Sequence, residues 1–116
     1  MFGDIDPLSR MEEGFSYVEH SLQRACEYID AFRDSYERRL WGDAQVYSAW
    51  LRDAYLALTP IAAQLQGALS GSGGIPGPAV LELNTRMKIS LDGIQVLGEA
   101  VREAAQLLGE AGHDAS

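Results

Sequence analysis

The side chains best suited to chemistry in this chain are Cys26, the only cysteine, and two histidines, His20 and His113. A cysteine becomes a nucleophilic thiolate when a histidine lies within hydrogen-bond distance of it. His20 and Cys26 stand six residues apart, which is about 120° around a helix at ~100° per residue. The two side chains therefore do not converge, and Cys26 is expected to be a small residue of the core.

The sequence does not indicate a metal or phosphate site either. Helical bundles hold metals with carboxylates and two Glu-x-x-His pairs on facing helices, and His20 has Tyr17 rather than an acid three residues before it. The glycines between Gly71 and Gly77 are not followed by the Lys-Ser/Thr of a phosphate-binding loop. We therefore expect no enzyme activity, no cofactor and no metal.

Apolar residues at steps of three and four predict the helices that hold these side chains. The steps alternate except from Tyr36 to Leu40, and Ser90 is the one polar member. A first series precedes Trp41, a second follows it, and a third follows the glycines. The three series are Met11, Phe15, Val18, Leu22, Ala25, Ile29, Phe32, Tyr36 and Leu40; Tyr47, Leu51, Ala54, Leu58, Ile61, Leu65 and Ala68; and Val80, Leu83, Met87, Ser90, Ile94, Leu97, Val101, Ala104 and Leu108.

Local signals set the ends of these helices. Asp6-Pro7 is typical of a helix start, Gly42 suits the residue after a helix, and Asp43 suits the next N-cap. Helices are expected at about 7–40, 43–69 and 78–111, with a glycine-rich connector at 70–77 and a kink at Pro60. The prediction is one all-α domain over residues 1–116, an antiparallel up-down-up bundle of three long helices with a heptad core, which oligomerisation could complete.

Composition narrows the class of protein. The 116 residues carry 17 Asp and Glu against 9 Lys and Arg, a formal charge of −8. That balance argues against nucleic acid as a partner, because phosphate binding needs a basic surface. No signal peptide and no apolar run long enough to span a membrane is visible, so a cytoplasmic protein is expected, with signal-independent secretion left open. Lys88 is the only lysine, a bias expected of a GC-rich bacterial genome.

The most informative feature is a gap in charge, because no Asp, Glu, Lys or Arg occurs from Ala54 to Leu81. A surface helix normally carries charge on its outer face. One interpretation is that the second helix is central and buried; the other is that helices 2 and 3 dock onto another helix, from a second copy or a partner. The predicted partner contacts are Trp50, Tyr55, Leu56, Ile89 and Val96; aromatic residues dominate such interfaces.

Residues 11–69 contain Leu40-Trp41-Gly42-Asp43 between two predicted helices, with Trp50 following. This arrangement resembles the helical hairpin of WXG100-type secreted factors, which implies a secretion-associated protein. The sequence departs from that family because no residue separates Trp41 from Gly42, and no tyrosine is followed four residues later by Asp or Glu. The small, acidic, helical character is also similar to that of secretion chaperones, which hold coiled-coil substrates.

Three functions therefore stay open. The preferred one is a non-enzymatic helical interaction or assembly subunit that forms homo- or hetero-oligomers. The first alternative is a small acidic secretion-associated protein, either a helical chaperone or a WXG100-like factor. The second is an acidic inhibitor that mimics nucleic acid; it needs acids gathered on one face, and Arg24, Arg33 and Arg38 interrupt those of the first helix.

Overall fold

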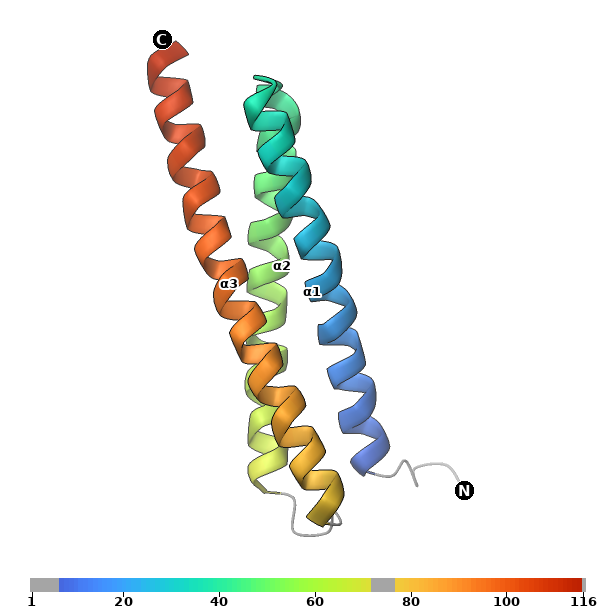
Figure 1. Ribbon diagram of the computed structural model, residues 1–116. Coiled ribbons are helices and arrows are strands. Elements are labelled where there is room, and N and C mark those ends of the chain that lie inside the picture. The colour runs from blue at the N-terminus through green and yellow to red at the C-terminus, as the bar shows by residue number, and fades with distance from the viewer. Residues whose placement is uncertain (1–6, 72–76, 116) are drawn as a thin grey trace.

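The computed structural model describes residues 7–71 and 77–115, with side chains placed for 8–71 and 77–111. Its elements are three helices, α1 (Pro7–Glu37), α2 (Trp41–Ser70) and α3 (Gly77–Ala115). They run up, down and up in a rod of 60 × 26 × 18 Å, with the α1–α2 turn and the end of α3 at the same end (Figure 1). No strand occurs in the described ranges. The predicted all-α antiparallel three-helix bundle is confirmed.

The core runs the length of the rod and follows most of the predicted apolar series, although Leu40 of the first series is exposed and Ala44 and Ala62 are buried outside the series. Its buried residues come from all three helices: Met11, Phe15, Val18, Ala25 and Phe32; Ala44, Leu51, Leu58, Ala62, Leu65 and Leu69; and Leu83, Met87, Ile94, Leu97 and Ala104. Ser90 is buried among the α3 residues, and its hydroxyl has no hydrogen-bond partner in the described structure. The α3 series therefore contains one polar residue that burial leaves unsatisfied.

The end of α2 differs from the prediction. Leu69 is buried, whereas Ala68, which the heptad series predicts for the core, is exposed. From Leu51 to Leu69 is 18 residues, about five turns of a straight helix at ~3.6 residues per turn, so both residues face the same side. A 3.5-residue period drifts away from that side over the same length, which is why the heptad assignment fails at Ala68.

The turn between α1 and α2 also corrects the predicted boundaries. α1 ends at Glu37, and Arg39, not Gly42, takes the left-handed conformation, with φ of 61°. The Arg39 amide donates to the Tyr36 carbonyl (3.1 Å) and the Leu40 amide to the Ser35 carbonyl (2.9 Å), the pair of bonds that defines a Schellman motif. Gly42 and Asp43 consequently lie inside α2, and Leu40 is its N-cap, without a side-chain hydrogen bond.

α2 continues through Pro60 as one helix rather than two. Proline has no backbone N–H to donate to the carbonyl of Leu56, four residues earlier. Both residues are exposed, so water can donate to that carbonyl instead. The predicted cap at Asp6 and most of the glycine connector, residues 72–76, lie outside the described residues. α3 extends to Ala115, beyond the expected end near 111.

Candidate interaction surfaces

Three regions of the bundle contain the predicted partner contacts and other exposed apolar side chains. The first region is the edge where α2 meets α1. Tyr28 of α1 packs against Tyr47 and Trp50 of α2, with ring centroids 6.4 and 5.2 Å apart, and Tyr47 and Trp50 meet edge-on at 5.6 Å. We call these three residues the aromatic cluster. Trp50 is 46% exposed, so this predicted contact residue is partly used by the bundle itself.

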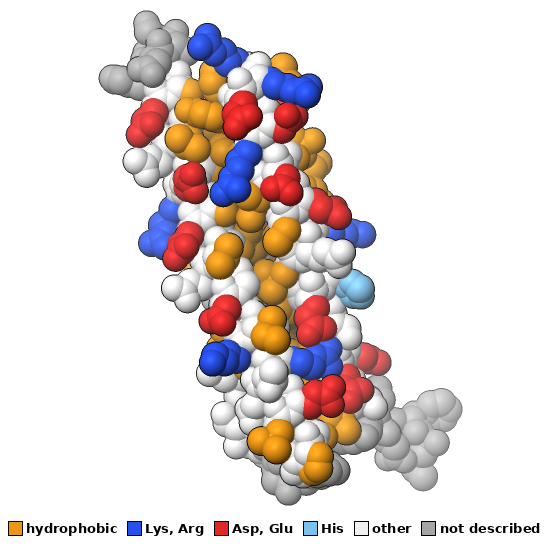
Figure 2. Space-filling model, in the orientation of Figure 1, with side chains coloured by type: hydrophobic (Ala, Val, Ile, Leu, Met, Phe, Trp, Pro, Cys, Tyr) orange, Lys and Arg blue, Asp and Glu red, His pale blue; other side chains and the backbone are white. Residues whose placement is uncertain are grey.

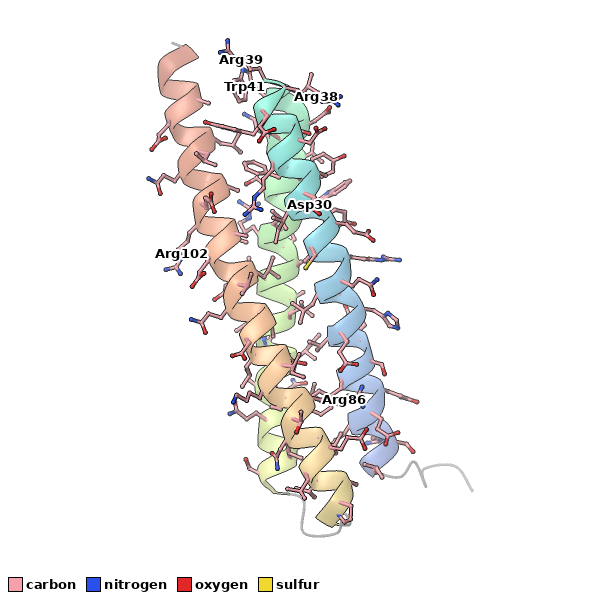
Figure 3. All side chains as sticks on the ribbon, viewed as in Figure 1. Asp30, Arg38, Arg39, Trp41, Arg86 and Arg102 are labelled. Carbon is pink, nitrogen blue, oxygen red and sulfur yellow. The ribbon has the colours of Figure 1, made fainter. Side chains whose placement is uncertain are left out.

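The same edge ends at the turn, where Trp41 packs edge-on against Tyr36 with centroids 5.4 Å apart. Figure 3 places Trp41 at this end of the bundle, beside Arg38 and Arg39. Trp41 is half-buried, which supports a role in closing the end of the hairpin. Aromatic rings from both helices therefore pack the C-terminal half of α1 against the N-terminal half of α2.

The second region is the outer surface of α2 after Asp53. Its exposed positions are Leu56, Ala57, Thr59, Pro60, Ala63, Gln64, Gln66, Gly67, Ala68 and Ser70. We call this set the uncharged face of α2. α2 does pack against both other helices, but these positions are exposed, so burial does not explain their lack of charge. The interpretation of α2 as a simply buried helix therefore fails for this stretch.

Two of the predicted contact residues belong to α2 but face different surroundings. Leu56 is 61% exposed on the uncharged face. Tyr55 is half-buried, and a Cβ added at Gly98 of α3 would lie only 2.7 Å from its ring. Gly98 therefore lets Tyr55 pack closely inside the bundle, and little of Tyr55 is left for a partner.

The third region is the edge where α3 meets α1. Gly93 of α3 lies against Leu22 of α1, so closely that an added Cβ would come within 2.9 Å of it. Ile89 and Val96 stand four residues before and three after Gly93, so they share its side of the helix. They are 62% and 57% exposed, and Figure 2 shows hydrophobic side chains running between α3 and α1 with charged residues on both sides.

One ion pair crosses this edge. The Arg86 guanidinium donates two hydrogen bonds to the Glu19 carboxylate, at 3.0 and 2.8 Å, and lies 5.3 Å from the centre of the Phe15 ring. The bond from Arg86 lowers the pKa of Glu19, against the opposing effect of desolvation. The same bond raises the pKa of Arg86, and the negative charges of Glu82 and Glu12 act in the same direction.

The five predicted contact residues thus do not form one patch. Trp50 lies on the α1–α2 edge, Leu56 on the uncharged face of α2, Tyr55 against Gly98, and Ile89 and Val96 on the α1–α3 edge. The sequence does give which side of its own helix each residue occupies. It does not give the order in which three helices surround the core, and that order separates the residues.

The residues first considered for chemistry stay apart. Cys26 is exposed rather than part of the core, and His20 is exposed on the same helix. Glu110 and His113 form one Glu-x-x-His pair in the sequence, whereas a metal site in a bundle needs two on facing helices; the side chain of His113 lies outside the described part of the chain. Within that part no three His, Cys, Asp or Glu residues group to hold a metal ion. No helix in the described ranges is long and apolar enough to cross a membrane.

The fold and these surfaces define a three-helix bundle with apolar residues left uncovered on two helices. No protein-family model, curated protein or solved structure matches the chain. Its function is therefore inferred from the uncovered surfaces themselves.

Proposed function

We propose that this protein is a non-enzymatic interaction or assembly subunit that binds helices of a second protein, or of a second copy, through uncharged surfaces of α2 and α3. The observation that carries the proposal is the uncharged face of α2. Every exposed position from Leu56 to Ser70 lacks charge, although solvent-facing helix positions are normally charged or strongly polar.

Packing geometry supports the same proposal. The uncharged face is made largely of Ala, Gly, Pro and Thr around Leu56, so a neighbouring helix could approach its backbone closely. An apolar surface rimmed by polar residues is typical of protein–protein contact sites. On α3, Ile89 and Val96 add large apolar side chains at helical spacing, which is the pattern that a helix-in-groove contact uses.

A secretion-associated role is the second candidate, and the hairpin turn favours it. Trp41 opens α2 directly after the turn and packs against Tyr36 of α1, as expected for a hairpin closed by an aromatic residue. α3 packs along that hairpin as a third long helix, which a two-helix factor lacks. A coiled-coil substrate encoded beside this gene, forming a stable complex with the purified chain, would favour this role over general assembly.

The experiment that tests the proposal is a measurement of mass in solution. Light scattering at increasing concentration, alone and with the products of neighbouring genes, is expected to give a mass above 12.6 kDa. Leu56→Glu with Ala63→Glu adds two charges to the uncharged face and should reduce that mass. The matched control is Gln45→Glu with Val46→Glu, which adds the same two charges at exposed α2 positions outside this face. A mass of 12.6 kDa under all these conditions would overturn the proposal.

A further inference from the structure

The edge between α3 and α1 forms a groove with two defined ends. At one end the Arg86–Glu19 pair connects the helices. At the other end a small cavity of about 20 Å³ lies between Ile29 and Arg33 of α1 and Ala100, Glu103 and Leu107 of α3, with Leu51 of α2 among its lining residues. We call this region the α1–α3 groove.

The middle of the groove is apolar and uncovered. On α3, Ile89 and Val96 project from either side of Gly93, at which Leu22 of α1 makes its close contact. On α1, Cys26 stands four residues after Leu22 and seven before Arg33, so it borders the groove between the ion pair and the cavity. Cys26 is exposed, which means that no side chain covers the α1 border there.

Leu22 packed on Gly93 forms the floor of the groove. Ile89 and Val96 on α3 and Cys26 on α1 border that floor and remain exposed, so no described side chain covers it. At the α1–α2 edge the corresponding space is filled by the rings of Tyr28, Tyr47 and Trp50. A helix that supplied large apolar side chains from outside would fill the α1–α3 groove in the way that those rings fill the other edge.

The borders of the groove are acidic. Glu82 stands four residues before Arg86 and Glu12 seven before Glu19, so both lie beside the ion pair at this end of the groove. Further along, Asp30 stands four residues after Cys26 and Glu103 seven after Val96, so both follow the same sides of their helices; both are exposed. Among the cations near these borders, Arg86 is already paired with Glu19, while Arg33, Lys88 and Arg102 are exposed near Asp30, Ile89 and Glu103.

We propose that the α1–α3 groove docks one amphipathic helix of a partner protein, with large apolar residues seated on Ile89 and Val96 and with Lys or Arg along both flanks. This inference rests on the proposed function and names its site and the chemistry of its partner. Charge complementarity selects the partner. A second copy is disfavoured because the exposed apolar residues of α3 are themselves flanked by Glu82 and Glu103, so self-docking would bring acids together.

The probe is a synthetic amphipathic peptide of about three heptads with Leu at the a and d positions and Lys at e and g. Two comparison peptides carry Glu at e and g, or the same Leu and Lys in scrambled order. We expect the Leu/Lys peptide alone to bind in calorimetry, and to bind more weakly when salt rises from about 0.1 M to about 0.5 M.

Neutral variants then locate the site. Ile89→Gln with Val96→Gln should weaken binding by about tenfold or more without changing the charge, while Leu56→Gln, at an equally exposed leucine of α2, should leave it unchanged. Circular dichroism checks that the variants remain folded. Reaction of Cys26, the only thiol in the chain, with an aromatic disulfide reagent should slow when the peptide is bound.

Several results would overturn the groove proposal. They are equal binding by the scrambled peptide, equal binding by the double variant, an unchanged rate of Cys26 reaction, or no binding at all. Loss of binding in Leu56→Gln alone would move the site to the uncharged face of α2 and leave the proposed function standing. A dimer that the double variant converts to a monomer would assign the groove to a second copy. A monomer in every mixture of the mass experiment would instead remove the proposed function.

Discussion

The two sides of α1 are covered in different ways, although the same apolar spacing produces both. Towards α2, rings from both helices pack together at Tyr28, Tyr47 and Trp50, and again at Tyr36 and Trp41. Towards α3, one bidentate ion pair and the Leu22–Gly93 contact hold the helices while Ile89 and Val96 stay exposed. Heptad spacing thus decides which side of a helix is buried, whereas the size of the residues beside it decides whether an edge closes.

The largest effect that separates the two sides is expected at Tyr28. Tyr28→Ala removes one ring from the aromatic cluster and should lower the free energy of unfolding by about 2 kcal/mol, from lost burial and lost ring contacts. Ile89→Ala, on the open side, should change it by less than about 0.5 kcal/mol, because the side chain is mostly in water and alanine favours a helix. Urea denaturation followed by circular dichroism measures both. Equal losses would show that the α1–α3 edge is packed as firmly as the other.

The next effect is on α3, where the buried hydroxyl of Ser90 has no hydrogen-bond partner among the described residues. Ser90→Ala keeps the volume nearly unchanged and removes the unsatisfied group, so it should raise the free energy of unfolding by about 1 kcal/mol. Ser21→Ala, at a half-buried position of α1, is the control for the gain in helix propensity alone. A loss of stability in Ser90→Ala would mean that the hydroxyl has a role in holding α3.

Most of the fold could be predicted from the sequence, and particular residues show why. The buried sides of α1 and α3 were predictable because Phe15, Val18, Leu83 and Leu97 repeat at helical spacing, and three such series with short connections leave few arrangements. The failures at Ala68 and Gly42 are local. The first arises from helix drift over five turns, and the second from a turn that places an arginine where glycine is the usual choice.

The surfaces were less predictable than the core. Gly93 and Gly98 accommodate Leu22 and Tyr55 of this chain, which are contacts that spacing along one helix does not reveal. Cys26 was expected in the core because its apolar neighbours Leu22 and Ala25 are part of the series. Which edge of α1 faces α2 and which faces α3 depends on the handedness of the bundle, and spacing along one helix carries no information on handedness. The charge gap was the more useful surface signal, since it pointed to positions of α2 after Asp53 that are exposed and uncharged.

A smaller effect on stability is expected at the turn that connects α1 and α2, whose shared edge is filled by aromatic rings. Arg39 holds φ of 61° at the left-handed position of the Schellman motif, a conformation that costs a non-glycine residue free energy. Arg39→Gly should raise the free energy of unfolding by about 0.5 kcal/mol, after the entropy of glycine in the unfolded chain is allowed for. Arg38→Gly, one residue earlier with ordinary backbone angles, should lower it. The same sign for both variants would contradict this account of the turn.

The smallest effect on stability is expected at the α1–α3 edge, from removal of the Arg86–Glu19 ion pair. In the folded chain the pKa of Glu19 lies below its usual value near 4.5, chiefly because of the hydrogen bond from Arg86. A lowered folded pKa contributes stability that is present above the unfolded pKa and is lost as pH falls through the folded one. Because the Glu19 side chain is 42% exposed, water and salt screen the pair, and Glu19→Gln should cost only about 0.5 kcal/mol at pH 7.

The pH dependence distinguishes the ion pair from a packing effect. The difference between the natural chain and Glu19→Gln should shrink as pH falls below about 4.5 and vanish once Glu19 is protonated in both the folded and unfolded states. Glu13→Gln removes another exposed acid of α1, six residues before Glu19, and should show no such loss at neutral pH. A constant difference across the acid range would mean that Glu19 holds the α1–α3 edge by shape rather than by charge, and that the open side is packed more like the closed one.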